Sequence, residues 1–351
     1  MDYDHQRLSY AQARETPCTG CEATCCTILP LHDFQIVRMQ DLDYAAYLLN
    51  FERIELAWLS GTAWRVHYRM PCSNLDPQTH LCTVHNTPAQ PNVCKRFNAY
   101  TCFYKRIFQS PEKASDTYLR VDRRRMALLS QMFVFDGHRE IVGVPDLAGA
   151  AAQMPPLEPI DDPPVPPAPM IEAYEEAART GTGLPSLRVR TFRDFDHPCS
   201  GCGAMCCSWL SFPHAVPQSV GNLDHIRFVL GFEGIEVGID ENEQWTVLVR
   251  TRCRHFRDDA RGEGRCGIFG QPQRPLVCSS YDASQCSYKY RFGQVRPERF
   301  LRLRATEFDA TSRLFQLDEH GFVLRRPGYT EIRQAIEQGW AHEGPLTPAS
   351  S

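Results

Sequence analysis

The sequence predicts an α+β protein built from two homologous, small, cysteine-rich modules that a proline-rich linker joins. Three observations support this prediction: sixteen cysteines, a Cys-x2-Cys-x3-Cys-Cys motif that occurs twice, and a stretch dense in proline between the two motifs. The first module is predicted to span residues 1–152, the linker residues 153–170 and the second module residues 171–351.

An internal repeat accounts for every cysteine in the chain. PCTGCEATCC in the first half returns as PCSGCGAMCC 181 positions later, and the same shift carries Trp64 onto Trp245 and Glu55 onto Glu236. After a three-residue insertion the shift becomes 184, and it superposes the last three cysteines of each copy. The first copy holds Cys18, Cys21, Cys25, Cys26, Cys72, Cys82, Cys94 and Cys102. The second holds Cys199, Cys202, Cys206, Cys207, Cys253, Cys266, Cys278 and Cys286.

Local patterns predict the elements of each copy. A helix is expected over residues 33–50, and two strands around a Ser-Gly turn in IELAWLSGTAWRVHYRM, so that Cys72 follows a strand end. NTPAQPNVCKRF is expected to form a short turn or helix that carries Cys94, and QMFVFDGHREIVGV a hairpin. Trp64 and Trp245 are expected to fill the core beside the cysteines. The proline-dense linker is expected to be extended, and MIEAYEEAART to form a short helix after it.

Composition limits the cellular setting and the partners. The N-terminal residues do not form a secretory signal, and no apolar run approaches the ~20 residues that span a bilayer. We therefore expect a cytoplasmic protein without a membrane partner, in which cysteines serve as metal ligands rather than disulfides. A net charge of −4 and the lack of a basic recognition helix argue against a nucleic-acid partner.

Eight thiols in each copy suit a soft metal ion, and all sixteen cysteines are candidate metal ligands. Cys-x2-Cys places two thiolates on a tight turn, the spacing of a zinc knuckle. Eight thiols fit two four-cysteine zinc sites, one binuclear zinc cluster with spare thiols, or an iron–sulfur cluster with additional cysteines. Because neighbouring side chains diverge, the adjacent Cys25 and Cys26 indicate two metal sites or one polynuclear cluster in each copy.

The other candidate residues are weaker. His85, His255, His138 and His320 are expected to be surface histidines rather than ligands. Neither a Walker loop, a dinucleotide-binding fingerprint, a nucleophile elbow nor an HExxH motif occurs, so no catalytic or cofactor-binding residue is assigned.

PCTGCEATCC, followed by MPCSNLDPQTHLCTVHNTPAQPNVC, resembles the YkgJ-type cysteine-cluster family, a zinc- or iron-chelating domain with a CxxCxxCC motif. The resemblance covers residues 17–102 and 198–286, and it implies that the chain is a tandem duplication of that domain. It implies that the eight cysteines of each copy form a metal site. The family's Cys–Ile–Tyr–x–x–Arg–Pro–x–x–Cys pattern is matched from Cys266 through Phe269, Arg274 and Pro275 to Cys278, whereas Gln90 and His85 replace the arginine and the aromatic residue in the first copy. Both copies have three residues before the paired cysteines where the family has two.

The leading interpretation is a cytoplasmic metal-binding protein whose zinc or iron sites have a structural or interaction role. The alternative is an iron–sulfur protein with electron-transfer or protein-modifying activity, because a related cluster occurs in a flagellin lysine methylase. Metal storage is weaker, since the chain carries a substantial aromatic core. The sequence does not decide whether the protein is an enzyme and names no protein partner. Each half is expected to fold and bind metal alone.

Overall fold

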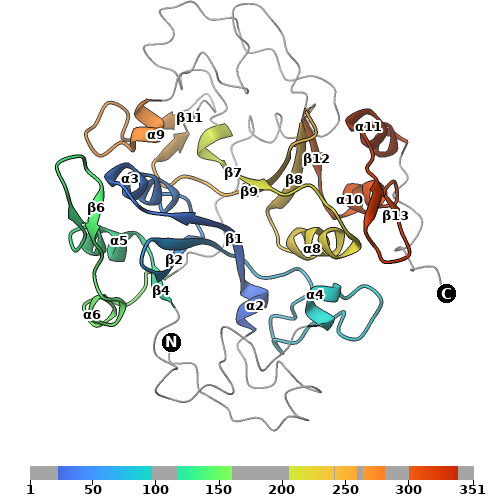
Figure 1. Cartoon of the computed structure of the whole chain (residues 1–351), viewed down its shortest axis with the longest axis horizontal. Helices are drawn as coiled ribbons and strands as arrows, with labels where there is room; N and C mark the ends of the chain where they lie inside the picture. Colours follow the sequence, from blue (N-terminus) through green and yellow to red (C-terminus); the bar gives the residue numbers. More distant parts are fainter. Residues whose placement is uncertain are drawn as a thin grey trace, which may run out of the picture.

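The computed structural model describes residues 23–96, 118–159, 205–240, 242–258, 264–280 and 300–338. Two four-stranded antiparallel sheets occupy its centre, and helices and three two-stranded sheets lie around them among the described residues (Figure 1). The combination of helices with antiparallel sheets confirms the predicted α+β class. No helix among these residues is long and apolar enough to cross a membrane.

The first sheet has the strand order β1-β3-β2-β4. Its strands are β1 (Ile28–Gln35), β2 (Ile54–Ser60), β3 (Ala63–Arg69) and β4 (Leu119–Val121). The other elements of this half are α2 (Thr24–Thr27), α3 (Met39–Leu48), α4 (Asn92–Lys95), α5 (Arg123–Leu129), β5 (Val134–Phe135), β6 (Ile141–Gly143) and α6 (Leu147–Ala151).

The second sheet has the order β12-β8-β9-β7, which is the order of the first sheet when the repeat is superposed. Its strands are β7 (Trp209–His214), β8 (Ile235–Asp240), β9 (Trp245–Arg250) and β12 (Phe300–Leu303). The other elements are η4 (Met205–Cys207), α8 (Val220–Leu230), β10 (Phe256–Asp258), β11 (Gly264–Cys266), α9 (Leu276–Ser279), α10 (Ala305–Ser312), β13 (Gln316–Leu317), β14 (Val323–Arg325) and α11 (Tyr329–Glu337). The two sheets thus share one strand order, with β1 and β7 at matching edges.

Alternation along the strands builds the core. On β3 the side chains of Trp64, Val66 and Tyr68 are fully buried on one face, as the two-residue period of a strand requires. Trp64 stacks on Trp58 of β2 at 5.8 Å between ring centroids, and Trp245 is likewise buried in the second half. The prediction that both tryptophans fill the core is confirmed, but their predicted position beside the cysteines is wrong. Trp64 pairs with Phe34 and Trp245 with His214, at the end of each sheet opposite to the cysteines.

The predicted helix over residues 33–50 begins too early. Residues 33–35 belong to β1, where Asp33 pairs with Arg65 and Phe34 with Trp64 in the antiparallel ladder. The helix itself is α3, and it begins at Met39, where the Asp41 carboxylate accepts hydrogen bonds from the backbone N–H of Val37 and Arg38. A strand that runs almost directly into a helix left no break in the apolar pattern for the sequence analysis to detect.

The other local predictions are confirmed where they lie in described residues. The Ser-Gly turn joins β2 to β3, with Gly61 at φ +52°. Cys94 lies on the short helix α4, and β5 and β6 form the predicted hairpin. The predicted helix MIEAYEEAART and the linker beyond residue 159 lie outside the described residues.

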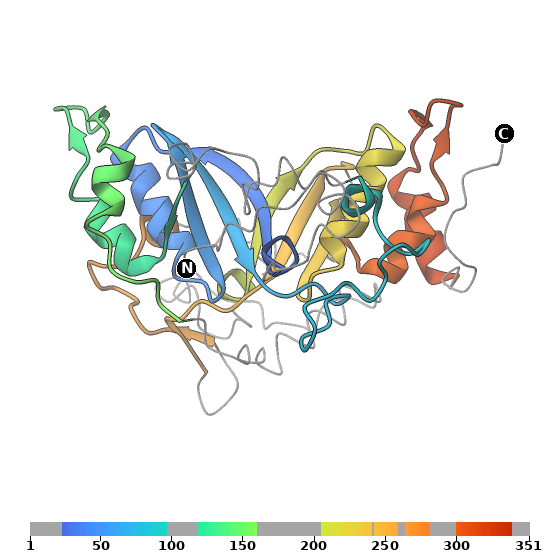
Figure 2. The same ribbon diagram turned by 90° about the horizontal axis from the view of Figure 1, so that it is seen from below.

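The two halves lie side by side around the centre. The edge strands β1 and β7 contact each other there, and the hairpins β5–β6 and β13–β14 lie at opposite outer ends (Figure 2). His32 of β1 stacks on Phe212 of β7 with 5.8 Å between ring centroids. Tyr68 also reaches across, donating a 3.0 Å hydrogen bond to the carbonyl of Glu233.

One buried carboxylate lies in each sheet at matching positions. Glu55 of β2 accepts hydrogen bonds from Arg120 at 2.8 Å and Arg69 at 3.1 Å, and Glu236 of β8 pairs with Arg302 and Arg304. Burial alone would raise the pKa of the Glu55 carboxyl, but the hydrogen bond and charge of Arg120 and the charge of Arg69 outweigh it and hold the pKa below its ordinary value.

We expect Glu55→Gln to lower the free energy of unfolding by about 2 kcal/mol at pH 7. A fully buried pair would lose roughly 3–5 kcal/mol, but Arg120 and Arg69 keep some access to solvent. A depressed folded-state pKa stabilises the fold above the unfolded value of about 4.3, and this contribution is lost as the pH falls through the folded value. Urea denaturation should therefore show the variant's deficit shrinking at acid pH. The exposed Glu140, 3.6 Å from Arg38, is the control: Glu140→Gln should cost less than about 0.5 kcal/mol at both pH values.

Candidate metal centre

The paired cysteines of each half lie just before the first strand of its sheet. Cys25 and Cys26 lie on α2, immediately before β1, and their sulfur atoms are 4.0 Å apart. Four thiolates at 2.3 Å around a tetrahedral zinc ion are separated by about 3.8 Å. The predicted divergence of these neighbouring side chains therefore does not separate the two thiols, and one ion could contact both. Cys206 and Cys207 lie on η4, immediately before β7.

A backbone contact brings a distant cysteine to each pair. The N–H of Cys72 donates to the carbonyl of Cys26 at 2.7 Å, and the N–H of Cys253 donates to the carbonyl of Cys207 at the same distance. The next cysteine returns on a short antiparallel bridge, which joins Cys82 to Leu75 and Cys266 to Phe256. The three-residue insertion of the repeat falls inside this loop, so it leaves the bridge intact.

The fourth described cysteine of each half lies on a four-residue helix. Cys94 is on α4 and Cys278 on α9, and a proline precedes each helix, Pro91 and Pro275. The extended backbone of both prolines, with ψ 141° and 147°, turns the chain into the helix. Such short helices are marginal by themselves, so their position depends on what they pack against.

Electrostatics group the same cysteines. Burial, followed by the charges of Cys25, Cys72 and Cys82, raises the pKa of Cys94 to about 12. Burial, followed by the charges of Cys206 and Cys253 and that of Cys266, raises the pKa of Cys278 to about 12. We call Cys25, Cys72, Cys82 and Cys94 the first thiol cluster, and Cys206, Cys253, Cys266 and Cys278 the second. The repeat superposes the two clusters member by member.

The donor set fits a soft metal ion. All ten described cysteines carry thiols, and burial raises the pKa of Cys72 and Cys94 in the first cluster and of Cys253 and Cys278 in the second. A soft cation would displace the protons of these thiols and neutralise the thiolates that form, whereas magnesium or calcium would find no carboxylate set there.

The clusters are not assembled as complete ligand sets. Within the ranges that the structure describes, no three His, Cys, Asp or Glu side chains are arranged to hold a metal ion. Six of the predicted ligands, Cys18, Cys21, Cys102, Cys199, Cys202 and Cys286, lie outside those ranges. The assignment of all sixteen cysteines as ligands therefore stays a prediction.

At matched positions beside the two clusters, the two halves have different pairs of interacting residues. In the second half the guanidinium of Arg274 lies 4.5 Å from the ring centroid of Phe269 and donates to the carbonyl of Cys278 at 2.6 Å. In the first half the matching residues are Gln90 and His85, whose side chains hydrogen-bond at 3.4 Å between Nε2 and Nδ1. Both pairs fix the loop that leads to the last described cysteine. His85 thus supports this loop from the surface, where it is exposed as predicted.

The remaining histidines divide into two kinds. His138 and His320 lie in exposed hairpin turns, as predicted. His255 is half-buried instead, and its Nε2 lies 3.2 Å from Oδ1 of Asn50 in the other half of the chain. Burial, with the charges of Arg123 and other arginines, lowers its pKa. The expectation of a plain surface histidine is therefore wrong for His255, which joins the two halves.

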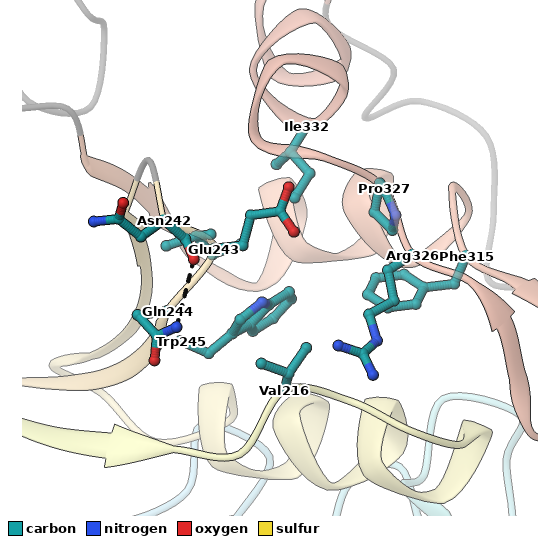
Figure 3. Close-up of a pocket in the computed structure, with 10 residues that line it drawn as sticks. Val216, Asn242, Glu243, Gln244, Trp245, Phe315, Arg326, Pro327 and Ile332 are labelled. Carbon is teal, nitrogen blue, oxygen red and sulfur yellow. Dashed lines mark hydrogen bonds between the residues drawn. The ribbon is translucent and has the colours of Figure 1, made fainter.

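A small cavity lies away from the thiols. It has a volume of about 160 Å³, and Trp245, Phe315 and Ile332 form much of its lining, with Glu243 and Arg326 at its edge (Figure 3). No cysteine lines it, and it offers one carboxylate only, so it is not a second metal site. This cavity could not be predicted from the sequence, because no motif includes its lining residues.

Two residues that the sequence analysis missed contact the cysteine-bearing helices. Asp224 of α8 accepts a 3.1 Å hydrogen bond from the N–H of Val93 on α4, and Asp43 of α3 accepts a 2.7 Å bond from the N–H of Leu276 on α9. The 181-residue shift superposes Asp43 on Asp224, and this identity was the available signal.

Residues 17–117 match the CxxCxxCC family model. The family is described as a "Putative zinc- or iron-chelating domain", and the match covers all eight cysteines of the first copy. It confirms the resemblance for this part of the chain and indicates chelation of zinc or iron, without deciding between the two metals. No curated protein and no solved structure matches the chain.

Proposed function

We propose that the protein binds zinc or iron at two cysteine clusters, one in each of two homologous modules. The modules are residues 1–152 and 171–351, and residues 153–170 link them. The observation that carries the proposal is the recurrence of one backbone contact, from the N–H of Cys72 to the carbonyl of Cys26 and from the N–H of Cys253 to that of Cys207, which brings a distant cysteine to the paired cysteines of each half. The other cysteines of each half would complete the ligand sets.

The proposed role is structural, or that of an interaction module, in the cytoplasm. Thiolate ligands in this number are stable in a reducing compartment, where disulfides do not compete. Each cluster joins segments that are far apart in sequence, α2, the loop after β3 and α4 in the first half, so a bound ion would cross-link them.

The alternative is an iron–sulfur protein with electron-transfer or protein-modifying, methylase-like activity. Eight cysteines in each module exceed the four ligands that one zinc ion needs, and this excess favours a larger cluster. The two proposals are distinguished by the bound metal and by the visible absorption of the purified protein.

Protein purified without oxygen is expected to carry at least one metal ion per module. Elemental analysis and the visible spectrum distinguish a colourless zinc protein from a brown one with acid-labile sulfide. Native mass spectrometry should show that Cys94→Ser and Cys278→Ser each lower the metal content by one module's share, and that the double variant loses both shares. The adjacent Ser279→Ala is the control and should keep the full content. A folded wild-type chain without metal would contradict the proposal.

A further inference from the structure

The helix that carries the last described cysteine of each half lies on the other half. Figure 1 shows α4 beside α8 and α9 beside α3, and the contacts of these helices agree with this arrangement. In Figure 2 the segment that ends in α4 extends from the first sheet toward the second half of the chain. One cysteine-bearing helix of each thiol cluster therefore packs against the opposite half of the chain.

A carboxylate makes the decisive contact on each side. Asp224 is 7% exposed, and its two oxygens accept from the backbone N–H of Val93 at 3.1 Å and from the side-chain amide of Asn92 at 3.4 Å. Asp43 accepts from the N–H of Leu276 at 2.7 Å. Hydrogen bonds to an ionised acceptor are about twice as strong as neutral ones, and these hold the first turn of α4 and of α9.

The loops that carry the second cysteine of each cluster are joined across the halves in the same reciprocal way. The N–H of Ser73, next to Cys72, donates to the carbonyl of Gly231 at 2.8 Å. The N–H of Arg254, next to Cys253, donates to the carbonyl of Asn50 at 2.8 Å. These donors and acceptors are superposed by the repeat, so the two contacts are copies of each other. Two of the four described thiols in each cluster are thus positioned by the opposite half.

We propose that the two metal sites are composite: Asp224 is a positioning residue for the first thiol cluster, and Asp43 is a positioning residue for the second. This inference rests on the proposed metal-binding function and adds that each site depends on the other half of the chain. A change in one half should loosen the thiols of the opposite half and leave its own in place. A merely structural contribution to the whole fold would not produce this crossed pattern.

The test measures the reactivity of individual thiols in the full metal-loaded chain. Wild type, Asp224→Asn and Asp43→Asn are treated briefly with N-ethylmaleimide, and modification of the peptides with Cys94 and Cys278 is quantified by mass spectrometry. Asp224→Asn is expected to speed modification of Cys94 about tenfold and to leave Cys278 unchanged, and Asp43→Asn to do the reverse. Asp41→Asn is the matched control, because Asp41 lies on α3 and accepts backbone hydrogen bonds from its own half only. Asp41→Asn should change the modification rate of neither Cys94 nor Cys278.

A second variant tests the same contact from its donor side. Leu276→Pro removes the N–H that Asp43 accepts, and proline suits this first helical position, which follows the extended Pro275. Because Leu276 is 55% exposed, the substitution leaves the core intact. It should speed modification of Cys278 only. Equal acceleration of Cys94 and Cys278, or acceleration in the same half as the substituted aspartate, would overturn the inference.

The metal content of the wild type separates the two proposals. If the wild type carries metal and the crossed pattern is missing, the composite sites are wrong while metal binding stands. If the wild type carries none, the proposed function fails, and amide hydrogen exchange of residues 91–96 and 275–280 in the same variants still tests the crossed support. Faster exchange in the opposite half would then sustain it, and unchanged exchange would overturn it.

Discussion

Residues 1–170 and residues 171–351, produced separately, are expected not to persist as folded monomers. Separation would break the backbone bridges of Phe51 with Cys253 and of Phe232 with Cys72, open the chain beside these two aromatic side chains, which are 1% exposed, and leave the backbone groups of the loops at Cys72 and Cys253 without their partners. Fully exposing one such aromatic side chain costs roughly 1.5–3 kcal/mol, and each half loses several of these contacts together. This expectation replaces independent folding of the halves, which the sequence alone predicted.

Circular dichroism and sedimentation velocity on each half and on their mixture would measure this effect. We expect folded material only where two halves associate, and recovery of metal on mixing. The control is a full chain with a protease site inserted among residues 160–170. Cleavage there should leave the folded pair intact, because the contacts between described residues of the two halves, such as Ser73 with Gly231 and Arg254 with Asn50, lie elsewhere in the chain. A folded, metal-loaded monomer of either half would show that the modules are independent after all.

Replacing His67 by leucine is expected to reduce the acid sensitivity of the fold between pH 6.5 and pH 4. His67 is 1% exposed, and neither ring nitrogen has a hydrogen-bond partner among the described residues. Burial lowers its pKa to about 4, the charge of Glu55 opposes this shift, and those of Arg65, Arg120 and Arg69 add to it. The second half carries Leu248 at the matching position, so the same sheet accommodates leucine there.

The sign follows from proton binding. Between pH 4 and 6.5 the unfolded chain protonates this histidine and the folded chain does not, so stability falls as the pH is lowered through that window. The loss amounts to about 3 kcal/mol at its acid end. Urea denaturation at pH 7.5 and pH 5 should show a smaller decrease for His67→Leu than for the wild type, and the variant should be about 1–2 kcal/mol more stable at pH 7.5, because an unsatisfied buried polar group is gone. His320→Leu, in an exposed turn, should keep the wild-type pH dependence. An unchanged slope in His67→Leu would contradict the assignment.

The sequence was informative where structure is local. The strands around the turn at Gly61, the hairpin after Phe133 and the short helix at Cys94 follow from patterns a few residues long, and all are present. The helix predicted from Asp33 was wrong in its first turns because pairing of Asp33 with Arg65, thirty-two residues away, decides that segment. Periodicity carries no information about such a partner.

At the candidate site, too, the grouping of residues could be predicted from the sequence, whereas the long-range packing could not. Superposing the repeats groups Cys25, Cys72, Cys82 and Cys94, and their mutual charges in the structure agree with that grouping. The crossing of α4 and α9 onto the opposite halves could not be predicted, since a repeat is equally compatible with packing inside one copy or between two. Asp43 and Asp224 are identical across the repeat, yet identity alone does not say that each bonds the other copy's helix.

Ser73 contacts Gly231, and Arg254 contacts Asn50, at positions that the 181-residue shift superposes. This reciprocal pattern is that of an isologous dimer interface, in which residue i of one subunit contacts residue j of the other and the reverse. A chain with one copy of the module would therefore meet a second such chain through the same surface, as a two-fold symmetric homodimer. Joining two such modules in one polypeptide would make that encounter intramolecular, at an effective concentration set by the length and stiffness of the connection. In a single polypeptide the two modules also need not be identical in sequence, as the two subunits of a homodimer must be. Each position then occurs once per molecule, so matched positions can differ, as His67 and Leu248 do, and Gln90 and Arg274.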